Sequence, residues 1–292
     1  MRTGLQIPNF SIPRGPAGLR DFLKQVAQTA DQGGIYSLWV MDHFFQIQNV
    51  GQPEEDMLES YTTLGYLAGL TEKIKLGTMV TGVIYRYPGL LVKTVSTLDV
   101  LSSGRAYLGI GAAWFEGEAL GLGVPFPPIA ERFELLEETL QVAHQMWGEK
   151  IEPFQGKHLS LARTLNHPQP LTKPHPPILI GGMGENKTMR LIAKYGDACN
   201  FFAGAGMDTL QEKLDMLKKR CEEAGRPYED IEKTVLDTVD FSKQTVADFV
   251  ERARALKSMG IQQYIFNCPQ LHTDPTVIHK ITTELVPALT AL

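Results

Sequence analysis

Hydrophobic residues along the chain follow two alternating patterns. Short runs of β-branched and aliphatic residues predict strands, several of them apolar on consecutive positions. Consecutive apolar positions are typical of strands that are buried on both faces of a parallel sheet. The predicted strands lie at residues 3–8, 35–41, 74–83, 106–111, 177–181, 197–202, 234–240 and 263–268.

The segments between these runs have the period of an amphipathic helix. The clearest covers 19–30, where apolar residues recur at intervals of three and four and form one face. Thr245 with Asp248 predicts a capping box, and Gly225 and Gly260 predict helix ends. Similar apolar faces predict helices at 59–70, 91–102, 129–147, 187–195, 208–224, 245–259 and 276–290.

Strand and helix alternate throughout and the chain ends in a helix. This order favours an α/β fold, a closed (β/α)8 TIM barrel with loop insertions, over an open doubly wound sheet. We find no internal repeat and no linker, so residues 1–292 are expected to form a single domain. Long segments at 42–58 and 112–128 leave the carboxyl ends of strands, where barrels bind ligands. A third, at 148–176, predicts an excursion with room for a small hairpin.

Composition limits the classes of partner. Basic residues are scattered and the net charge is −5, so a nucleic-acid partner is not expected. No run of about 18 uncharged apolar residues occurs, which predicts no membrane span and a cytoplasmic protein. Cys199, Cys221 and Cys268 lack the paired spacing of metal or redox sites and are expected to be buried thiols.

Two glycine-bearing strand ends are candidate ligand sites. Gly109–Glu118 (GIGAAWFEGE) lies at the end of one predicted strand, but Trp114 stands where a GxGxxG fingerprint has its third glycine. The alternative is that the glycines only allow the chain to leave the strand, with Trp114 packing over the barrel. Ile180–Asn186 (IGGMGEN) precedes a predicted helix whose amides could bind a phosphate. Glu185 would sit poorly beside that anion, so its alternative role is a first-turn carboxylate.

Asp42 and His43 close another strand, so an imidazole could reach the barrel mouth and transfer a proton. The alternative is a structural pair that ties the strand to its loop. Gly77 and Gly82 indicate a bulge or a close backbone approach. The remaining excursion histidines, His158, His167 and His175, are irregularly spaced, and no metal site is expected from them.

Taken in order, these motifs resemble the luciferase-like monooxygenase (bacterial luciferase) superfamily, and more narrowly its branch of oxidoreductases that depend on the deazaflavin coenzyme F420. The resemblance covers nearly the whole chain. Gly156-Lys-His and 166–170 (NHPQP) favour F420 over FMN. The motifs that carry it are 39–44 (WVMDHF), 76–80 (LGTMV), 108–116 (LGIGAAWFE), 131–134 (ERFE) and 176–185 (PPILIGGMGE).

The resemblance implies a cofactor ring across the barrel mouth and a role for each motif. Asp42 and His43 would touch the ring region, and Met79-Val80 would be a non-proline cis peptide supporting one ring face. The ribityl chain would be lined by Ala112, Ala113, Trp114 and Gly117, and the phosphate by Gly181, Gly182 and Met183.

Two positions depart from the family pattern. Sugar-phosphate dehydrogenases of the F420 branch have a glutamate near the position of Trp114, so their substrate is not carried over to this chain. Met183 stands where relatives often have glycine or serine, which leaves room for a shifted phosphate site.

The resulting expectation is an enzyme that transfers a hydride between F420 and a small organic substrate, with His43 as the first catalytic candidate and Glu118 as a candidate acid. The family also suggests a homodimer. Alternatives are an FMN-dependent monooxygenase on the same fold, a non-catalytic flavin-binding protein, and an aldolase or isomerase barrel. The last alternative often needs a strand-borne lysine, whereas Lys75 only opens a strand and Lys173 and Lys187 lie in or beside loops.

Overall fold

The computed structural model of the chain describes residues 1–148 and 150–292, and its strands form a parallel barrel. The nine-stranded sheet has the order β3-β2-β1-β11-β10-β9-β8-β5-β4. A parallel bridge between Leu76 of β3 and Ala106, just before β5, closes the circle. The strands are β1 (Arg2–Ile7), β2 (Ser37–Val40), β3 (Lys75–Thr78), β4 (Thr81–Gly82), β5 (Leu108–Gly111), β8 (Ile178–Gly181), β9 (Ala198–Phe202), β10 (Glu232–Thr238) and β11 (Gln263–Asn267).

The third predicted strand is interrupted. We expected one strand over 74–83, but β3 and β4 are separate, and the Met79-Val80 peptide bond between them is cis. β3 pairs with β2, and β4 pairs with β5, so the two halves occupy one position of the barrel. The predicted cis peptide and the closed parallel barrel are therefore both confirmed.

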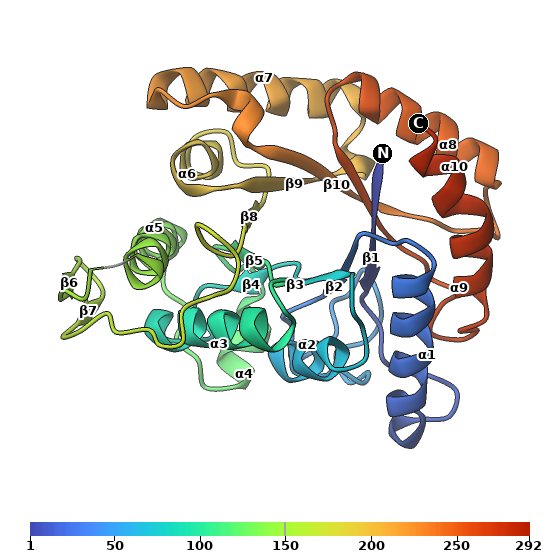
Figure 1. The fold of residues 1–292 in the computed structure, drawn as a ribbon, viewed down its shortest axis with the longest axis horizontal. Coiled ribbons are helices and arrows are strands. Elements are labelled where there is room, and N and C mark those ends of the chain that lie inside the picture. The colour runs from blue at the N-terminus through green and yellow to red at the C-terminus, as the bar shows by residue number, and fades with distance from the viewer. Residues whose placement is uncertain (149) are drawn as a thin grey trace.

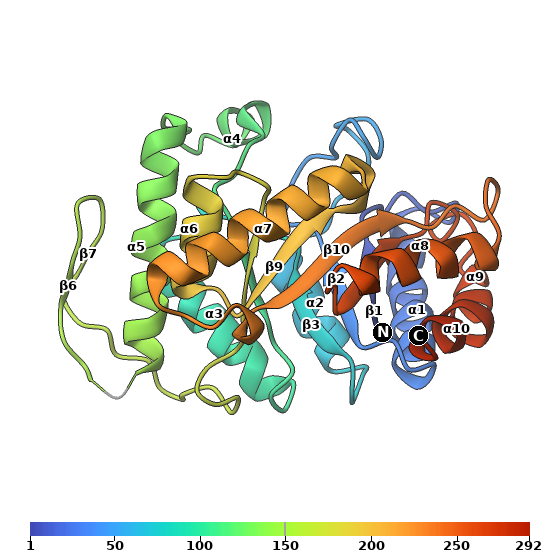
Figure 2. The same ribbon diagram turned by 90° about the horizontal axis from the view of Figure 1, so that it is seen from above.

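Helices surround this barrel (Figures 1 and 2). Each predicted helix is present, and Thr245 with Asp248 forms the predicted capping box. Gly225 has a left-handed backbone (φ 67°) at the end of its helix. The helices are α1 (Leu19–Gln32), α2 (Ser60–Ala68), α3 (Pro88–Leu101), α5 (Ile129–Trp147), α6 (Lys187–Tyr195), α7 (Met207–Ala224), α8 (Val246–Ser258), and a C-terminal segment of α9 (Val277–Lys280), a π-helical turn (Ile281–Leu285) and α10 (Val286–Thr290). Short 3-10 turns lie at Pro16–Gly18, Ala203–Ala205 and Tyr228–Asp230.

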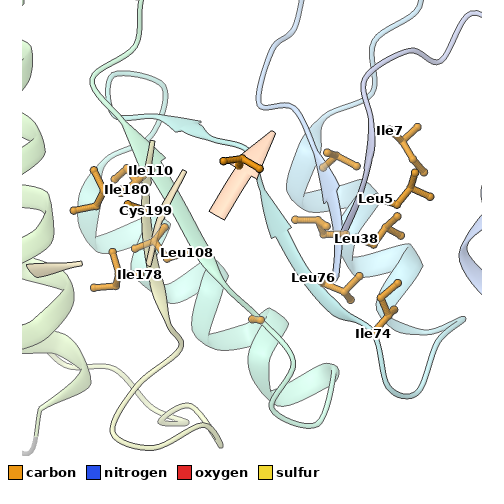
Figure 3. Packing of buried hydrophobic residues seen from close by; sticks show 14 of the residues in the cluster. Leu5, Ile7, Leu38, Ile74, Leu76, Leu108, Ile110, Ile178, Ile180 and Cys199 are labelled. Carbon is orange, nitrogen blue, oxygen red and sulfur yellow. The ribbon is translucent and has the colours of Figure 1, made fainter. Parts of the chain in front are cut away.

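Both faces of the strands are buried, which explains the consecutive apolar positions. Side chains such as Leu5, Leu38 and Ile178 belong to the large cluster between the strands and the helices. Figure 3 shows this cluster, with Leu108, Ile110, Ile178, Ile180 and Cys199 in one group and Leu5, Ile7, Leu38, Ile74 and Leu76 in another. The residues between them on the strands form a separate cluster inside the barrel: Trp39, Met79, Tyr107, Leu179, Ala198 and Ile265.

Packing inside the barrel requires a residue without a side chain at position 77. A Cβ atom at this position would lie 2.6 Å from the ring of Trp39. Trp39 is fully buried and donates its Nε1 hydrogen to Ser37, at 2.7 Å. The glycine of the third strand therefore makes room for the largest side chain of the barrel interior.

Two insertions lie outside the alternating pattern. The segment 112–128 contains a short helix, α4 (Glu116–Gly121), which the sequence did not predict. The excursion 148–176 contains an antiparallel hairpin of β6 (Phe154–Gln155) and β7 (Ser160–Leu161), which confirms the expected hairpin. In Figure 1 it lies beyond α5, and Glu138 of α5 accepts hydrogen bonds from the hairpin amides of Lys157, His158 and Leu159.

The remaining expectations concern cysteines, metal ligands and membrane spans. All three cysteines are free and buried. His158 bonds to Glu134, and His175 stacks on Trp147, and no cluster of three or more His, Cys, Asp or Glu suited to a metal ion occurs within 1–148 and 150–292. None of the helices in these ranges is long and apolar enough to span a membrane.

Candidate active site at the carboxyl ends of the barrel strands

A cavity of about 1150 Å³ opens at the carboxyl ends of the strands. Ligand sites of (β/α)8 barrels occur at this end, because the loops that follow the strands enclose it. The glycine-bearing ends of β5 and β8, which we predicted to share a ligand, both contribute to its wall. The predicted residues that line the cavity are Asp42, His43, Met79, Val80, Ala112, Ala113, Trp114, Gly181 and Gly182.

One part of the wall is nearly free of projecting side chains. Gly111 and Gly181 flank Val80, and a Cβ atom on either glycine would lie 3.0 Å from a Val80 methyl group. Gly82 of β4 lines the same cavity. The glycines around the Met79-Val80 bond therefore pack closely against Val80 and leave Met79 and Val80 as the apolar lining of this part of the cavity.

The loop after β8 leads directly into α6. Gly182 has a positive φ of 121°, which L side chains rarely adopt. α6 begins without a side-chain cap, although the amide of Met189 already donates to the carbonyl of Gly184 at 3.2 Å. The amides before it in the first turn are the candidate donors to an anion, and buried Thr188 of this turn lines the cavity. Glu185 forms an ion pair with Lys213 at 2.6 Å. It precedes α6, whose first turn contains no acidic residue, so the alternative role as a first-turn carboxylate is wrong. Met183 packs against the outer core and does not line the cavity.

His43 is held from behind by a buried carboxylate. Its Nδ1 atom lies 3.0 Å from Oε2 of Glu118, which is fully buried. The same carboxylate accepts hydrogen bonds from the amides of Phe44 (2.5 Å) and Phe45 (2.9 Å) and from the hydroxyl of Tyr85. Because a carboxylate only accepts, the Nδ1 atom of His43 donates, and its Nε2 atom is left to accept a proton.

The electrostatic environment keeps Glu118 ionised. Burial by itself raises the pKa of this carboxyl, but the hydrogen bonds from His43, Tyr85 and Phe45 outweigh it and lower the pKa below the usual value. The pKa of Tyr85 is raised, first by burial and then by its bond to Glu118, so the phenol keeps its proton. Glu118 does not line the cavity, and neither does its helix neighbour Gly117.

Trp114 covers the outside of His43. The two rings have an edge-on arrangement with centroids 5.3 Å apart, and Trp114 stacks on Phe115 at the same centroid distance. The Trp114 side chain is 61% exposed, although it also lines the cavity. Ala113, just before it, has a positive φ of 60°. The loop after β5 thus presents an aromatic surface at the cavity mouth.

Asp42 belongs to a second buried network beside the first. Arg86 bonds to Asp42 at 2.7 Å and to Glu59 at 2.5 Å, and Ser60 donates to Asp42 at 2.5 Å. The amide of Gly82 also donates to Asp42, at 3.2 Å. Burial raises the pKa of Asp42, and the Arg86 guanidinium works in the opposite direction. Asp42 therefore ties the end of β2 to β4 and to the start of α2, as the structural alternative proposed, while it also lines the cavity.

Sequence reasoning missed several residues of the site. Tyr85 and Arg86 lie in the loop between β4 and α3, and nothing in their spacing pointed to Glu118 or Asp42. Three cavity residues had a signal: Gln6, Asn200 and Asn267 are polar side chains within otherwise apolar strands. A polar residue at an inward position of a barrel strand is a candidate ligand-contacting residue. The pattern of 3–8, 197–202 and 263–268 could therefore have identified them.

A parallel barrel with a ligand cavity at the carboxyl ends of its strands defines a class of proteins, and sequence comparison gives the family. A family model described as luciferase-like monooxygenase matches residues 1–273. The chain belongs to the luciferase-like monooxygenase family.

Individual relatives differ in the chemistry that their names state. An F420-dependent glucose-6-phosphate dehydrogenase of Kineococcus radiotolerans is 31% identical over 300 residues, 94% of this chain and 85% of that protein. An F420-dependent secondary alcohol dehydrogenase in complex with an F420-acetone adduct superposes with a TM-score of 0.82 at 19% identity, covering 99% of this chain and 98% of that one. The monooxygenase RslO1 of Streptomyces bottropensis superposes with a TM-score of 0.77 at 17% identity, covering 98% and 99%. The structural matches establish the shared fold.

Proposed function

We propose that residues 1–292 act as one catalytic domain, an oxidoreductase that transfers a hydride between coenzyme F420 and a small organic substrate. The observation that carries the proposal is the His43–Glu118 pair, which places a proton-accepting imidazole in the wall of a cavity that Met79 and Val80 also line. The curated relative named for F420 and matched over 94% of the chain supports the choice of cofactor.

The residues present fit the cofactor. Met79 and Val80 would lie against the ring, and Asp42 and His43 would lie near its edge. Ala112, Ala113 and Trp114 would line the ribityl chain, and Gly181 and Gly182 with the first turn of α6 would hold the phosphate. Gly117 and Met183 would support this wall from behind.

F420 supplies hydride transfer when bound, and the protein supplies position and proton transfer. Oxidation of an alcohol to a carbonyl compound removes a hydride from carbon, which bound F420 would take, and a proton from oxygen. His43 would accept that proton at Nε2, because Nδ1 already donates to Glu118. In the reverse direction the same Nε2 would return the proton to the carbonyl oxygen.

Glu118 would act through His43. Its carboxylate is fully buried and already accepts from four groups, so its position suits orienting the imidazole and stabilising the imidazolium. This role differs from direct proton donation to the substrate, which Glu118 was expected to offer from the sequence. Tyr85 would complete the arrangement by holding the same Oε2 atom.

The described lining of the cavity offers no unpaired lysine or arginine to an anion. The lysine and arginine among its described lining residues are Lys243 and Arg252, and each is paired with a carboxylate. An FMN-dependent monooxygenase is the second candidate, because the fold also superposes on the monooxygenase RslO1.

Cofactor titration tests the proposal. We expect the purified protein to quench F420 fluorescence, and to leave FMN fluorescence unchanged at the same concentrations. His43→Ala should retain F420 binding within a few-fold and lose on the order of 10²- to 10⁴-fold in turnover. His279→Gln, which changes an exposed histidine of α9 that does not line the cavity, is the control. Binding of FMN in place of F420 would favour the monooxygenase, and binding of neither would refute both.

The proposal also includes a homodimer in the cytoplasm. Tyr87 (79% exposed), Leu90 (66%) and Leu101 (69%) stand out from α3 and the residue before it, and a spacing of eleven places Leu90 and Leu101 on one helix face. Buried free thiols fit a reducing compartment. Light scattering should give twice the monomer mass for the wild type and the monomer mass for Leu90→Glu, with Ile151→Glu as an exposed control. A monomeric wild type would contradict the dimer.

A further inference from the structure

The cavity has a second polar region, formed by the carboxyl ends of β10 and β11 and the loops that follow them. We call it the β10–β11 wall. Sequence analysis assigned it no role, and the residues proposed to hold the cofactor lie elsewhere, on the loops after β2, β3, β5 and β8. Its polar members are Asp237, Thr238, Asp240, Lys243, Gln244, Arg252, Asn267 and His272.

The guanidinium of this wall is already engaged. Nη1 of Arg252 lies 2.8 Å from Oδ2 of Asp237, and Nη2 donates to Gln244 at 3.0 Å. The hydroxyl of Tyr264, a fully buried residue, donates to the same carboxylate oxygen. Arg252 is therefore fixed in an ion pair, and its charge is balanced within the wall.

The lysine of the wall is paired as well. Nζ of Lys243 lies 2.9 Å from Oδ2 of Asp240, and the other oxygen of Asp240 accepts from Ser242 at 2.6 Å and from Gln270 at 2.5 Å. These bonds, first that from Ser242 and then that from Lys243, hold the pKa of Asp240 well below its usual range. Two cations thus face two carboxylates, and the wall offers no surplus positive charge.

Beside these ion pairs, the β10–β11 wall and the neighbouring strand ends carry amide and apolar side chains. Gln6, Asn200 and Asn267 contribute amide groups, and Leu236 and Leu271 contribute apolar surface. Amides donate and accept hydrogen bonds without carrying charge. His272 adds an imidazole that can do the same toward a hydroxyl or carbonyl group. This surface is suited to an uncharged ligand with hydrogen-bonding oxygens.

We propose that the β10–β11 wall makes this enzyme selective for an uncharged alcohol or carbonyl compound and against a phosphate ester. The inference rests on the proposed function, and it distinguishes the chain from the relative named for glucose 6-phosphate. Unpaired cations stabilise a phosphate dianion most strongly, whereas here the dianion would approach Asp237 and Asp240, which already hold Arg252 and Lys243. An uncharged substrate does not disturb either pair.

Glucose and glucose 6-phosphate form a matched pair of probes, because they differ only in the phosphate. Their dissociation constants would be measured on F420-loaded protein by ligand-observed NMR. We expect the wild type to bind glucose 6-phosphate no tighter than glucose. Asp240→Asn, which keeps the size of the side chain and releases Lys243, should bind glucose 6-phosphate at least tenfold tighter, with glucose unchanged. Glu251→Gln, an exposed charge change on the adjoining helix α8, should change neither.

Two results would overturn the inference: tighter binding of glucose 6-phosphate than of glucose by the wild type, or no tenfold gain in Asp240→Asn. Asp237→Asn, which releases Arg252, gives a second measurement if the first variant folds poorly. The proposed function is tested separately in the same samples by F420 fluorescence. It fails if the wild type does not quench this fluorescence. The two failures are therefore distinguishable.

Discussion

At the scale of single residues, the candidate site depends on two buried carboxylates, each of which accepts several hydrogen bonds from its neighbours. Glu118 accepts from two backbone amides, a histidine and a tyrosine, and Asp42 accepts from an arginine, a serine and a backbone amide. Charge-assisted hydrogen bonds are stronger than neutral ones, so these two groups fix the loops around them. Removing either carboxylate should lower the free energy of unfolding as well as the enzymatic activity.

Replacing Glu118 by glutamine gives a pH-dependent loss of stability. The pKa of Glu118 is below its ordinary value of 4.5 in the folded protein, so its stabilising contribution is complete above that pH and disappears as the pH falls through the folded-state pKa. We expect Glu118→Gln to cost roughly 1.5–3 kcal/mol at pH 7. The difference from wild type, measured by urea unfolding, should shrink below about pH 4.5. A difference that stays constant down to pH 3.5 would show that ionisation of Glu118 is not responsible.

At the scale of secondary-structure elements, the site is assembled where several loops meet. The loop after β2 carries Asp42 and His43, the loop after β4 carries Tyr85 and Arg86, and α4 after β5 carries Glu118. Each network joins at least two of these loops, so the loops stabilise one another although each alone is irregular. Arg86 is central, because it bonds to both Asp42 and Glu59.

Removal of Arg86 tests this coupling. Arg86→Met leaves the buried Asp42 carboxylate without its cation, and breaking a buried pair in this way typically costs about 3–5 kcal/mol. Adding Asp42→Asn should restore part of the loss, because the uncompensated charge is then gone. Unfolding free energies of the two single variants and the double variant give the coupling energy. Strict additivity of the two changes would contradict the proposed pair.

The capping box of α8 gives a prediction for a regular element. Thr245 accepts from the amide of Asp248, and the Asp248 side chain accepts in return from the amide of Thr245. Thr245→Ala should lower the free energy of unfolding by about 1 kcal/mol. Thr283→Ala, whose exposed hydroxyl bonds only to a carbonyl within its own helix, should change it by less than about 0.5 kcal/mol. Equal effects of the two substitutions would argue against the cap.

At the scale of the whole molecule, the cavity links ligand binding to the stability of the barrel. Its wall includes residues from β1, β4, β5, β9, β10 and β11, so a bound molecule contacts strands that are far apart in the sequence. A ligand that binds only the folded state raises the free energy of unfolding in proportion to the logarithm of its concentration.

Addition of F420 should therefore raise the thermal midpoint. At a free concentration one hundred times its dissociation constant, F420 is expected to add about 2.7 kcal/mol to the free energy of unfolding. For a chain of this size the midpoint should rise by several degrees, which differential scanning calorimetry can measure. Glucose 6-phosphate at millimolar concentration should produce no rise beyond that of glucose. Absence of a shift with saturating F420 would contradict binding at the barrel mouth.

The sequence by itself determined the order and nature of the main elements. Consecutive apolar runs predicted the strands because both of their faces are buried, and the helical periods predicted the surrounding helices because one face of each packs on the barrel. The family resemblance located the glycine-bearing strand ends and the cis peptide. The hydrophobic pattern of the sequence did not predict α4, because a six-residue helix with glycines at 117 and 121 carries little local signal.

Only the tertiary structure decided which side chains meet. The distance from Glu118 to His43, the engagement of Arg86 with Asp42, and the pairing of Lys243 and Arg252 with Asp240 and Asp237 arise where separate loops converge. Local propensity acts over a few residues. Hydrogen bonds and ion pairs between loops depend instead on closure of the barrel, because closure brings together at one rim the ends of strands that are far apart in the sequence, such as β1 and β11. For this reason the pattern of residues predicted the fold, and the folded chain decided the charge of its site.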